Sequence, residues 1–229
     1  EFVERQVLTL EESEEEFPSA EEGGQAVTTG VVCNSVDSCR ALCSQPESSW
    51  PKSNEKTIAP DQTQQIPNIA GLQAGGGVKA TPAMIEKLKT AAGIAQAASG
   101  GPYIIKVTSG YRPMSKQIQL VCEKFAAADK GQYDINKLGT AIAWPGGSNH
   151  GSGKAVDVQL LKGDQVLVCS GCYDSQSSSQ YTATAPILAD IMFQVGFVRY
   201  CKEIWHFELP GTGSGCRSTS CRSNTIGCP

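Results

Sequence analysis

Apolar residues recur at helical spacing in three parts of the chain. The first part follows Thr81-Pro82, a typical cap and first-turn pair, and stops at Gly100-Gly101. The second runs from its cap at Ser115 to about Ala128, and the third from Pro186 to Val195. Each part is expected to form a helix that buries one apolar face. A shorter helix is expected over residues 135–143.

Strand patterns separate these helices. From Lys154 to Leu161, every second residue is apolar, whereas Asp157 falls on the opposite face and is free to serve a site. Tyr103 to Thr108 is a short stretch rich in β-branched residues and is expected to be a strand. Two more short strands are expected near the end of the chain, at Phe197–Cys201 and Ile204–Leu209.

Composition divides the chain into four segments. Residues 1–30 form an acidic tail with nine Glu and one Arg in the first 22 positions; we expect it to be solvated, with a pro-segment or a docking strand as alternatives. Residues 31–78 combine a cysteine-containing extension with a linker or irregular wrap rich in Pro, Ser, Gln and Gly. The main domain is expected at 79–212, with a polar loop from Ser175 to Thr184. A cysteine-rich tail follows at 213–229.

Ten cysteines, an even number, are typical of disulfides formed in an oxidising compartment. Cys39 and Cys43 share one face if their segment is helical, so each is expected to pair with another partner. For Cys169 and Cys172, separate disulfides are favoured over a redox or zinc pair, because no second pair stands at zinc-ribbon spacing. We therefore expect a secreted or cell-envelope protein. The start at Glu1 without a signal-like segment agrees with a mature secreted chain.

The formal net charge of −4 comes from the acidic tail, because the remaining chain has 18 Lys and Arg against 14 Asp and Glu. This balance gives no reason to expect nucleic acid as a partner, and it suits an acidic polymer such as a cell wall. The sequence has no run of 18 apolar residues, so no membrane span is expected. A monomer is assumed.

The two histidines of the chain both lie in segments suited to metal chemistry. His150 stands in a glycine-rich loop seven residues before Asp157, and His206 lies near the end of the chain. Two His and one Asp leave the fourth position of a zinc ion open, as in catalytic sites. Glu203, three residues before His206, suits a general base, provided that it lies in a turn entering the strand.

Three ordered motifs resemble the zinc D,D-carboxypeptidases and dipeptidases of the VanY/VanX type, which trim bacterial cell-wall peptides. They are Ser109-Gly110-Tyr111-Arg112, the segment from Ser148 to Asp157, and Glu203-Ile204-Trp205-His206. The resemblance covers roughly residues 79 to 210. It implies an α+β fold like that of hedgehog and D-Ala-D-Ala peptidases, with helices on a small antiparallel sheet and with disulfide-tied extensions at both ends.

The resemblance also implies roles for individual residues. His150, Asp157 and His206 are implied as zinc ligands, Glu203 as the catalytic base and Arg112 as a group that stabilises charge. Four more candidates are expected to contact substrate: Tyr111, Gln117, Ser148 and Trp205. For each of these a plainer role stays open: packing for Tyr111 and Trp205, an exposed helix position for Gln117, and holding the loop for Ser148.

The implied activity is zinc-dependent hydrolysis of peptidoglycan stem peptides, foremost the removal of a terminal D-alanine. An endopeptidase that cuts inside the stem, or an L,D-carboxypeptidase, uses the same ligands. A non-catalytic surface protein is the alternative from another class, because the hedgehog signalling domain uses this fold without cutting. The presence of Glu203 favours an enzyme.

Overall fold

A computed structural model describes residues 33, 35–52, 56–138, 142–170, 178–200, 203–211 and 215–216. Its centre is β5 (Ala155–Lys162), the longest strand of a seven-stranded sheet. One edge of β5 pairs with β4 (Ile104–Ser109). The other edge pairs first with β8 (His206–Glu208) and then with β6 (Gln165–Val168). The strand that carries Asp157 is therefore held on both sides.

The outer strands complete this sheet in the order β2-β4-β5-β8-β7-β9. They are β2 (Leu72–Ala74), β7 (Val198–Tyr200) and β9 (Gly215–Cys216). All pairs are antiparallel except β2 with β4, which is parallel. A separate two-stranded sheet joins β1 (Gln64–Gln65) to β3 (Lys79–Ala80). The expected antiparallel sheet thus has one parallel edge.

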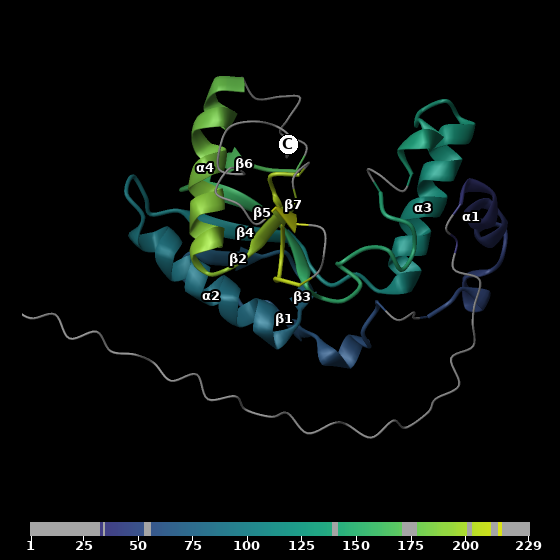
Figure 1. Cartoon of the computed structure of the whole chain (residues 1–229), viewed down its shortest axis with the longest axis horizontal. Helices are drawn as coiled ribbons and strands as arrows, with labels where there is room; N and C mark the ends of the chain where they lie inside the picture. The colour runs from purple at the N-terminus through teal and green to yellow at the C-terminus, as the bar shows by residue number, and fades with distance from the viewer. Residues whose placement is uncertain are drawn as a thin grey trace, which may run out of the picture.

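Two helices, α2 (Pro82–Ala97) and α4 (Ser178–Gln194), pack against the sheet (Figure 1). Their apolar side chains and those of the strands form the main core, in which Met84, Leu88, Val158, Leu188 and Phe207 are almost completely buried. The α+β class expected from the sequence is confirmed. Among the described residues, no helix has the length and apolar character needed to cross a membrane.

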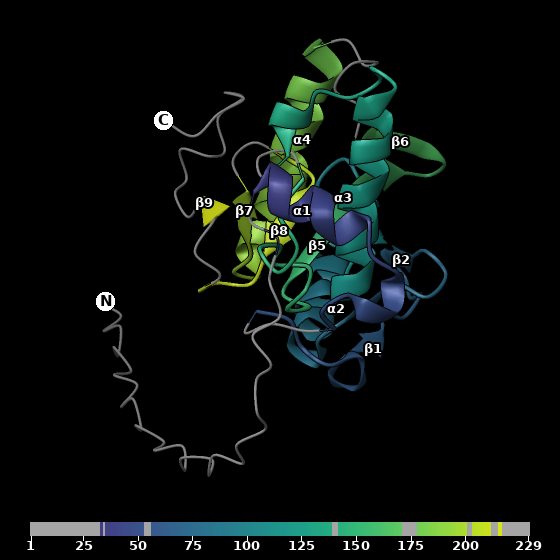
Figure 2. The ribbon, with the colours of Figure 1, turned by 90° about the vertical axis from the view of Figure 1, so that its right-hand side faces the viewer.

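A second apolar cluster lies between α3 (Met114–Asp129) and α1 (Val36–Cys43), which pack together apart from the main core (Figures 1 and 2). It contains Leu42, Trp50, Ile118, Val121 and Phe125. Disulfides join Cys33 to Cys39 and Cys43 to Cys122. As expected from their spacing on one helix, Cys39 and Cys43 pair with other partners. Cys169 is also disulfide-bonded.

Two helix starts differ from the expectation. The helix α3 begins at Met114, so Ser115 lies inside it and is not the cap; Pro113 has φ −63° and ψ 157° and holds the chain extended just before the helix. The helix α4 begins at Ser178, so part of the expected polar loop is helical and Pro186 lies inside the helix. The hydroxyl of Thr184, in the first half of α4, donates to the carbonyl of Leu167 and so joins this helix to β6.

Two other segments also depart from the expectation. The described residues of the expected helix at 135–143 form a 3-10 turn (Ile135–Lys137) and a bridge between Leu138 and Ile142. Leu138 is buried in the second apolar cluster. The stretch expected to be a linker includes β1 and β2, as well as the 3-10 turns Glu47–Ser49 and Pro60–Gln62. The acidic tail at 1–30 lies outside the described residues, as does the tail at 213–229 except for β9.

Candidate metal centre

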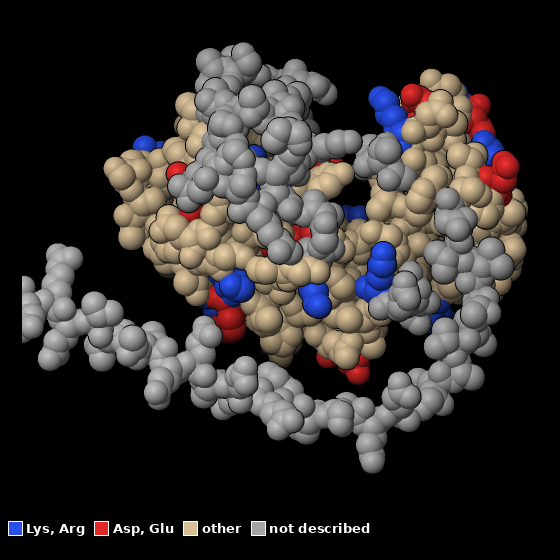
Figure 3. All heavy atoms as spheres, in the orientation of Figure 1, with Lys and Arg blue, Asp and Glu red and all other residues tan. Residues whose placement is uncertain are grey.

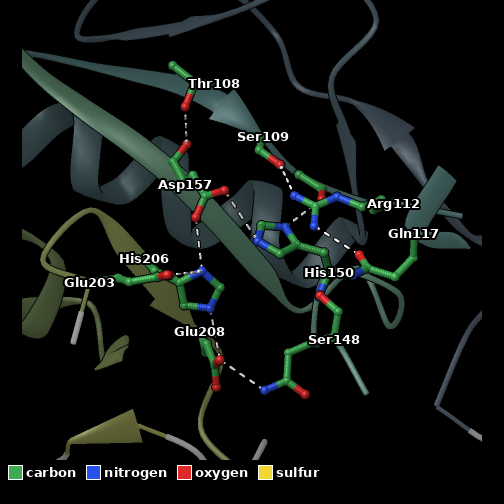
Figure 4. A network of polar contacts seen from close by, with 12 residues as sticks. Thr108, Ser109, Arg112, Gln117, Ser148, His150, Asp157, Glu203, His206 and Glu208 are labelled. Atoms are coloured by element: carbon green, nitrogen blue, oxygen red, sulfur yellow. Dashed lines mark hydrogen bonds and ion pairs between the residues drawn. The ribbon is translucent and has the colours of Figure 1, made fainter. Parts of the chain in front are cut away.

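Two parts of the chain that are far apart in the sequence bring the candidate ligands together. His150 lies in the loop before β5, Asp157 lies in β5, and His206 is the first residue of β8. The register of these strands sets Asp157 directly opposite His206. One potential ligand atom from each of the three residues lies within 4.8 Å of the other two (Figure 4). The predicted ligands therefore form one cluster.

The imidazole of His150 is oriented by the segment that follows β4. Its Nδ1 lies 2.8 Å from the carbonyl oxygen of Gly110, so Nδ1–H is the donor and Nε2 faces the cluster. Nε2 lies 3.4 Å from a carboxylate oxygen of Asp157. The amide of Arg112 donates to the carbonyl of His150 at 3.0 Å. A side chain at Gly110 would collide with the carbonyl oxygen of Lys79, so the close approach requires glycine.

The ring of His206 has a carboxylate at each nitrogen. Nδ1 lies 2.9 Å from Oδ1 of Asp157, and Nε2 lies 2.9 Å from Oε1 of Glu208. Burial disfavours the charged ring, yet these two hydrogen bonds raise the pKa of His206 to about 9. Burial also opposes the charged form of Asp157, but hydrogen bonds with His150 and His206 hold its pKa far below the usual value. Asp157 is thus an ionised ligand at neutral pH.

Glu203 lies beside this cluster in the turn that the sequence interpretation requires. The amide of His206 donates to the carbonyl of Glu203 at 3.0 Å, so Ile204 and Trp205 lie in a turn and the strand begins only at His206. The carboxylate of Glu203 reaches 3.9 Å from Nδ1 of His206. Burial raises its pKa; His206 opposes the shift and Asp157 adds to it. A carboxylate of raised pKa next to a metal site suits a general base.

Arg112 faces the cluster from the other side and is held by two side chains. Its Nη1 donates to Oε1 of Gln117 at 3.0 Å, and its Nη2 donates to Oγ of Ser109 at 3.1 Å (Figure 4). Burial lowers the pKa of the guanidinium, and the charges of Asp157 and Glu203 oppose that shift. With both terminal nitrogens anchored, the remaining N–H groups can only point in fixed directions.

Gln117 is therefore a support for Arg112. Its side chain is only 3% exposed, so the exposed helix position considered for it is wrong. While Oε1 accepts from Arg112, Nε2 donates to the carbonyl of Ala143 at 2.6 Å. Gln117 is not among the residues that line the cleft, so it does not contact a substrate there.

The other three candidates occupy different places. The hydroxyl of Tyr111 donates to the carbonyl of Ile58 at 2.9 Å, and Tyr111 is not among the residues that line the cleft. Ser148 and Trp205 do line it. The Oγ of Ser148 accepts from the amide of His150 at 3.3 Å and so helps to shape the loop.

The cleft in front of the cluster has a volume of about 550 Å³. It lies between the part of the molecule that holds the sheet and the part that holds α3, where the surface is hollowed (Figure 3). Several lining residues were not predicted: Leu120, Ile142, Asn149, Tyr200 and Glu208. Of these, Glu208 had a signal in the sequence, because it shares a strand face with His206 at a spacing of two.

The donor set fits a zinc ion. Two imidazole nitrogens and one carboxylate are the ligands found in catalytic zinc sites, and a cleft adjoins them. The second nitrogen of each histidine is already bound to an oxygen acceptor, as is usual for metal-ligating histidines. The site therefore has the ligands of a zinc centre and the surrounding hydrogen bonds that orient them.

A comparison with known protein families gives one match. The sequence model of a family described as VanY, D-alanyl-D-alanine carboxypeptidase, matches residues 82–209, more than half of the chain. No curated protein matches the chain.

Solved structures that resemble the chain include the three that follow. A zinc-bound mutant of the vancomycin resistance D,D-pentapeptidase VanY is 24% identical, with 61% of this chain and 78% of that chain covered and a TM-score of 0.42. The LD-carboxypeptidase LdcB is 22% identical, with 69% and 72% covered and a TM-score of 0.47. DacB from Streptococcus pneumoniae is 24% identical, with 59% and 68% covered and a TM-score of 0.39.

Proposed function

Because the chain belongs to the VanY family of D-alanyl-D-alanine carboxypeptidases, we propose that it is a zinc-dependent peptidase that removes the terminal D-alanine of peptidoglycan stem peptides. The observation that supports this proposal most directly is the cluster of His150, Asp157 and His206 with Glu203 beside it. This combination supplies metal ligands and a base within one cleft. A structural zinc site would be closed by a fourth protein ligand.

In this proposal, His150, Asp157 and His206 hold the zinc ion. A bound zinc ion supplies a water of lowered pKa and polarises a carbonyl group. The ionised state of Asp157 matters here, because its low pKa makes a negatively charged ligand available over the whole neutral range. The cleft volume of about 550 Å³ is in the range of small-ligand sites and suits a short peptide.

Glu203 moves the proton. Its carboxylate lies next to the metal-facing nitrogen of His206, where an attacking water would bind. It accepts a proton from that water and returns it to the nitrogen of the leaving amine. Its raised pKa brings the carboxylate closer to the pH at which both transfers are efficient.

Arg112 stabilises negative charge across the cleft from Glu203. Because Gln117 and Ser109 fix its guanidinium, the group needs no reorientation when charge develops on the carbonyl oxygen. The same group can bind a terminal carboxylate with paired hydrogen bonds. An acidic substrate end is therefore expected on the Arg112 side of the cleft.

We also propose that the protein works outside the cytoplasm, where its substrate is found. This proposal is supported by the disulfides Cys33–Cys39 and Cys43–Cys122, which persist in oxidising compartments.

Mass spectrometry of a stem pentapeptide ending in D-Ala-D-Ala tests the proposal. Zinc-loaded protein is expected to release one alanine, and both a chelator and Glu203→Gln are expected to stop the release. Zinc content of the variant, measured in parallel, should equal that of the wild type, because Glu203 is not among the three ligands.

Other results would indicate a different activity. Cleavage within the stem would indicate an endopeptidase, and release of alanine from a tetrapeptide alone would indicate an L,D-carboxypeptidase. Zinc-bound protein that cuts none of these peptides would overturn the enzymatic proposal and favour a binding protein.

A further inference from the structure

We propose that Glu208 is a positioning residue for the metal centre, which holds His206 in the one tautomer that presents Nδ1 to the metal. Glu208 is not one of the three ligands, and it lies on the far side of the His206 ring from Asp157 (Figure 4). The proposal rests on the zinc site proposed above and assigns this carboxylate a role in metal affinity.

The hydrogen bonds around Glu208 determine which atom carries the proton. Oε1 of Glu208 accepts from Nδ2 of Asn149 at 2.9 Å, and the same oxygen lies 2.9 Å from Nε2 of His206. An ionised carboxylate has no hydrogen to donate, so Nε2 of His206 must be the donor. Without a metal, Nδ1 in turn donates to Asp157 at 2.9 Å. A metal held at Nδ1 would take the place of that proton, while Glu208 keeps the proton on Nε2.

Glu208 is buried in the middle of the sheet, next to the ring of His206. It is 2% exposed, and its strand pairs on both sides, with Ala155 of β5 and Val198 of β7 opposite it. A buried carboxylate is costly unless its oxygens are hydrogen-bonded, so its contacts with Asn149 and His206 are strongly favoured. The ring orientation of His206 is therefore set before a metal binds.

The two histidine ligands differ in this respect. His150 donates its second N–H to a backbone carbonyl, that of Gly110, whereas His206 donates to a carboxylate. A charged acceptor makes the hydrogen bond stronger and the opposite nitrogen a better ligand. Removal of Glu208 should thus weaken the metal site mainly through His206. It also removes a contact of Asn149, but the ring of His150 keeps its own hydrogen bond to Gly110.

Zinc affinity provides the test, measured by competition with a chromogenic chelator on the full chain. Glu208→Ala is expected to weaken zinc binding by about 10–100-fold, the usual effect of losing such a partner. Glu208→Gln keeps an acceptor oxygen but loses the charge, and is expected to weaken binding by about fivefold, because charged hydrogen bonds are about twice as strong as neutral ones. Asp164→Ala, which removes an exposed carboxylate in the turn after β5, serves as the control and should leave the affinity unchanged.

Nitrogen-15 NMR of histidine-labelled protein gives a second readout, which is simple because the chain has only two histidines. In the zinc-loaded wild type, the His206 ring is expected to carry its proton on Nε2, with a signal protected from exchange with water. In Glu208→Ala this signal should exchange rapidly, while the ring of His150 stays unchanged. A merely structural loss would disturb both rings.

The outcomes separate this inference from the proposed function. Wild-type protein that binds no zinc would overturn both. Wild-type protein that binds zinc, with Glu208→Ala equal to it in affinity and in the Nε2–H signal, would overturn the role of Glu208 and leave the zinc site standing. If Glu208→Ala does not fold, an unchanged affinity in Glu208→Gln has the same meaning.

Discussion

Around the candidate metal centre, two of the polar side chains that act are held by second groups. Arg112 is held by Ser109 and Gln117, and His206 by Glu208. Such support matters because catalysis depends on groups that are oriented before the substrate arrives. At the scale of single residues, the effects of substitutions are therefore expected where these supporting contacts are lost.

Gln117→Ala is expected to lower kcat/KM by about tenfold or more, because Arg112 loses the acceptor that fixes its Nη1, and small misplacements of catalytic groups cost up to about 10²-fold. Steady-state kinetics on a stem peptide measures the effect, and zinc content should stay constant. Gln119→Ala is the matched control, because Gln119 is exposed on the same helix. Equal kinetics for the two variants would contradict the supporting role of Gln117.

The zinc-free protein is expected to lose stability as the pH rises through the neutral range. The pKa of His206 is raised from 6.5 in the unfolded chain to about 9 in the folded protein, so the folded state keeps a proton that the unfolded state releases. The stabilisation is complete below pH 6.5 and is lost as the pH approaches about 9. Urea unfolding at a series of pH values measures it.

The control for this prediction is His206→Asn, in which the dependence should flatten over the same interval. A free energy of unfolding that stays constant or increases with pH in the zinc-free wild type would show that His206 does not keep its proton.

At the scale of elements, the site depends on how β5, β8 and α3 are held in place. The pairing of β5 with β8 sets Asp157 opposite His206, and α3 carries Gln117 toward Arg112. The helix α3 is in turn joined to the N-terminal α1 by the disulfide between Cys43 and Cys122. The N-terminal extension thus braces one wall of the cleft.

The two described disulfides should differ in their effect on stability. Cys43 and Cys122 are 79 residues apart, whereas Cys33 and Cys39 are 6 apart. From the loop entropy of the unfolded chain, replacing the long-range pair by serines should cost about 4 kcal/mol and replacing the short-range pair about 2 kcal/mol. Thermal or urea unfolding of the two double variants compares them. A larger loss for the short-range pair would mean that the entropy of the unfolded chain is not the main cause.

At the scale of the whole molecule, the cleft lies between two apolar clusters, one around the sheet and one around α3. Ligands from the loop before β5, from β5 and from β8 meet in this cleft. A metal bound there joins segments that are more than 50 residues apart in the sequence, from His150 to His206.

Zinc is therefore expected to raise the unfolding temperature of the whole protein. Binding to the folded state alone stabilises by about 2.7 kcal/mol when free zinc is 100 times its dissociation constant. Differential scanning calorimetry with and without a chelator measures this shift, which should persist in Glu203→Gln and disappear in His150→Ala. A shift of equal size in His150→Ala would indicate that zinc binds elsewhere.

Much of the candidate site could be predicted from local sequence. The strand period turns Asp157 away from the core, and the spacing of Glu203 and His206 requires the turn that the structure contains. The main helices and the two central strands also follow from periodicity, with errors at their ends. These features depend on neighbours within a few residues, so the chain carries them in its local pattern.

The remaining features depend on contacts between distant residues. Only the tertiary structure decided that Asp157 faces His206, that Glu208 binds the second nitrogen of His206 and that Gln117 is buried against Arg112. It also decided that β2, within an apparent linker, is the parallel edge of the sheet. The sequence pattern of a polar side chain is the same whether its hydrogen bonds are made with water or with a buried partner. Which of the two occurs is determined by the packing of elements far apart in the chain.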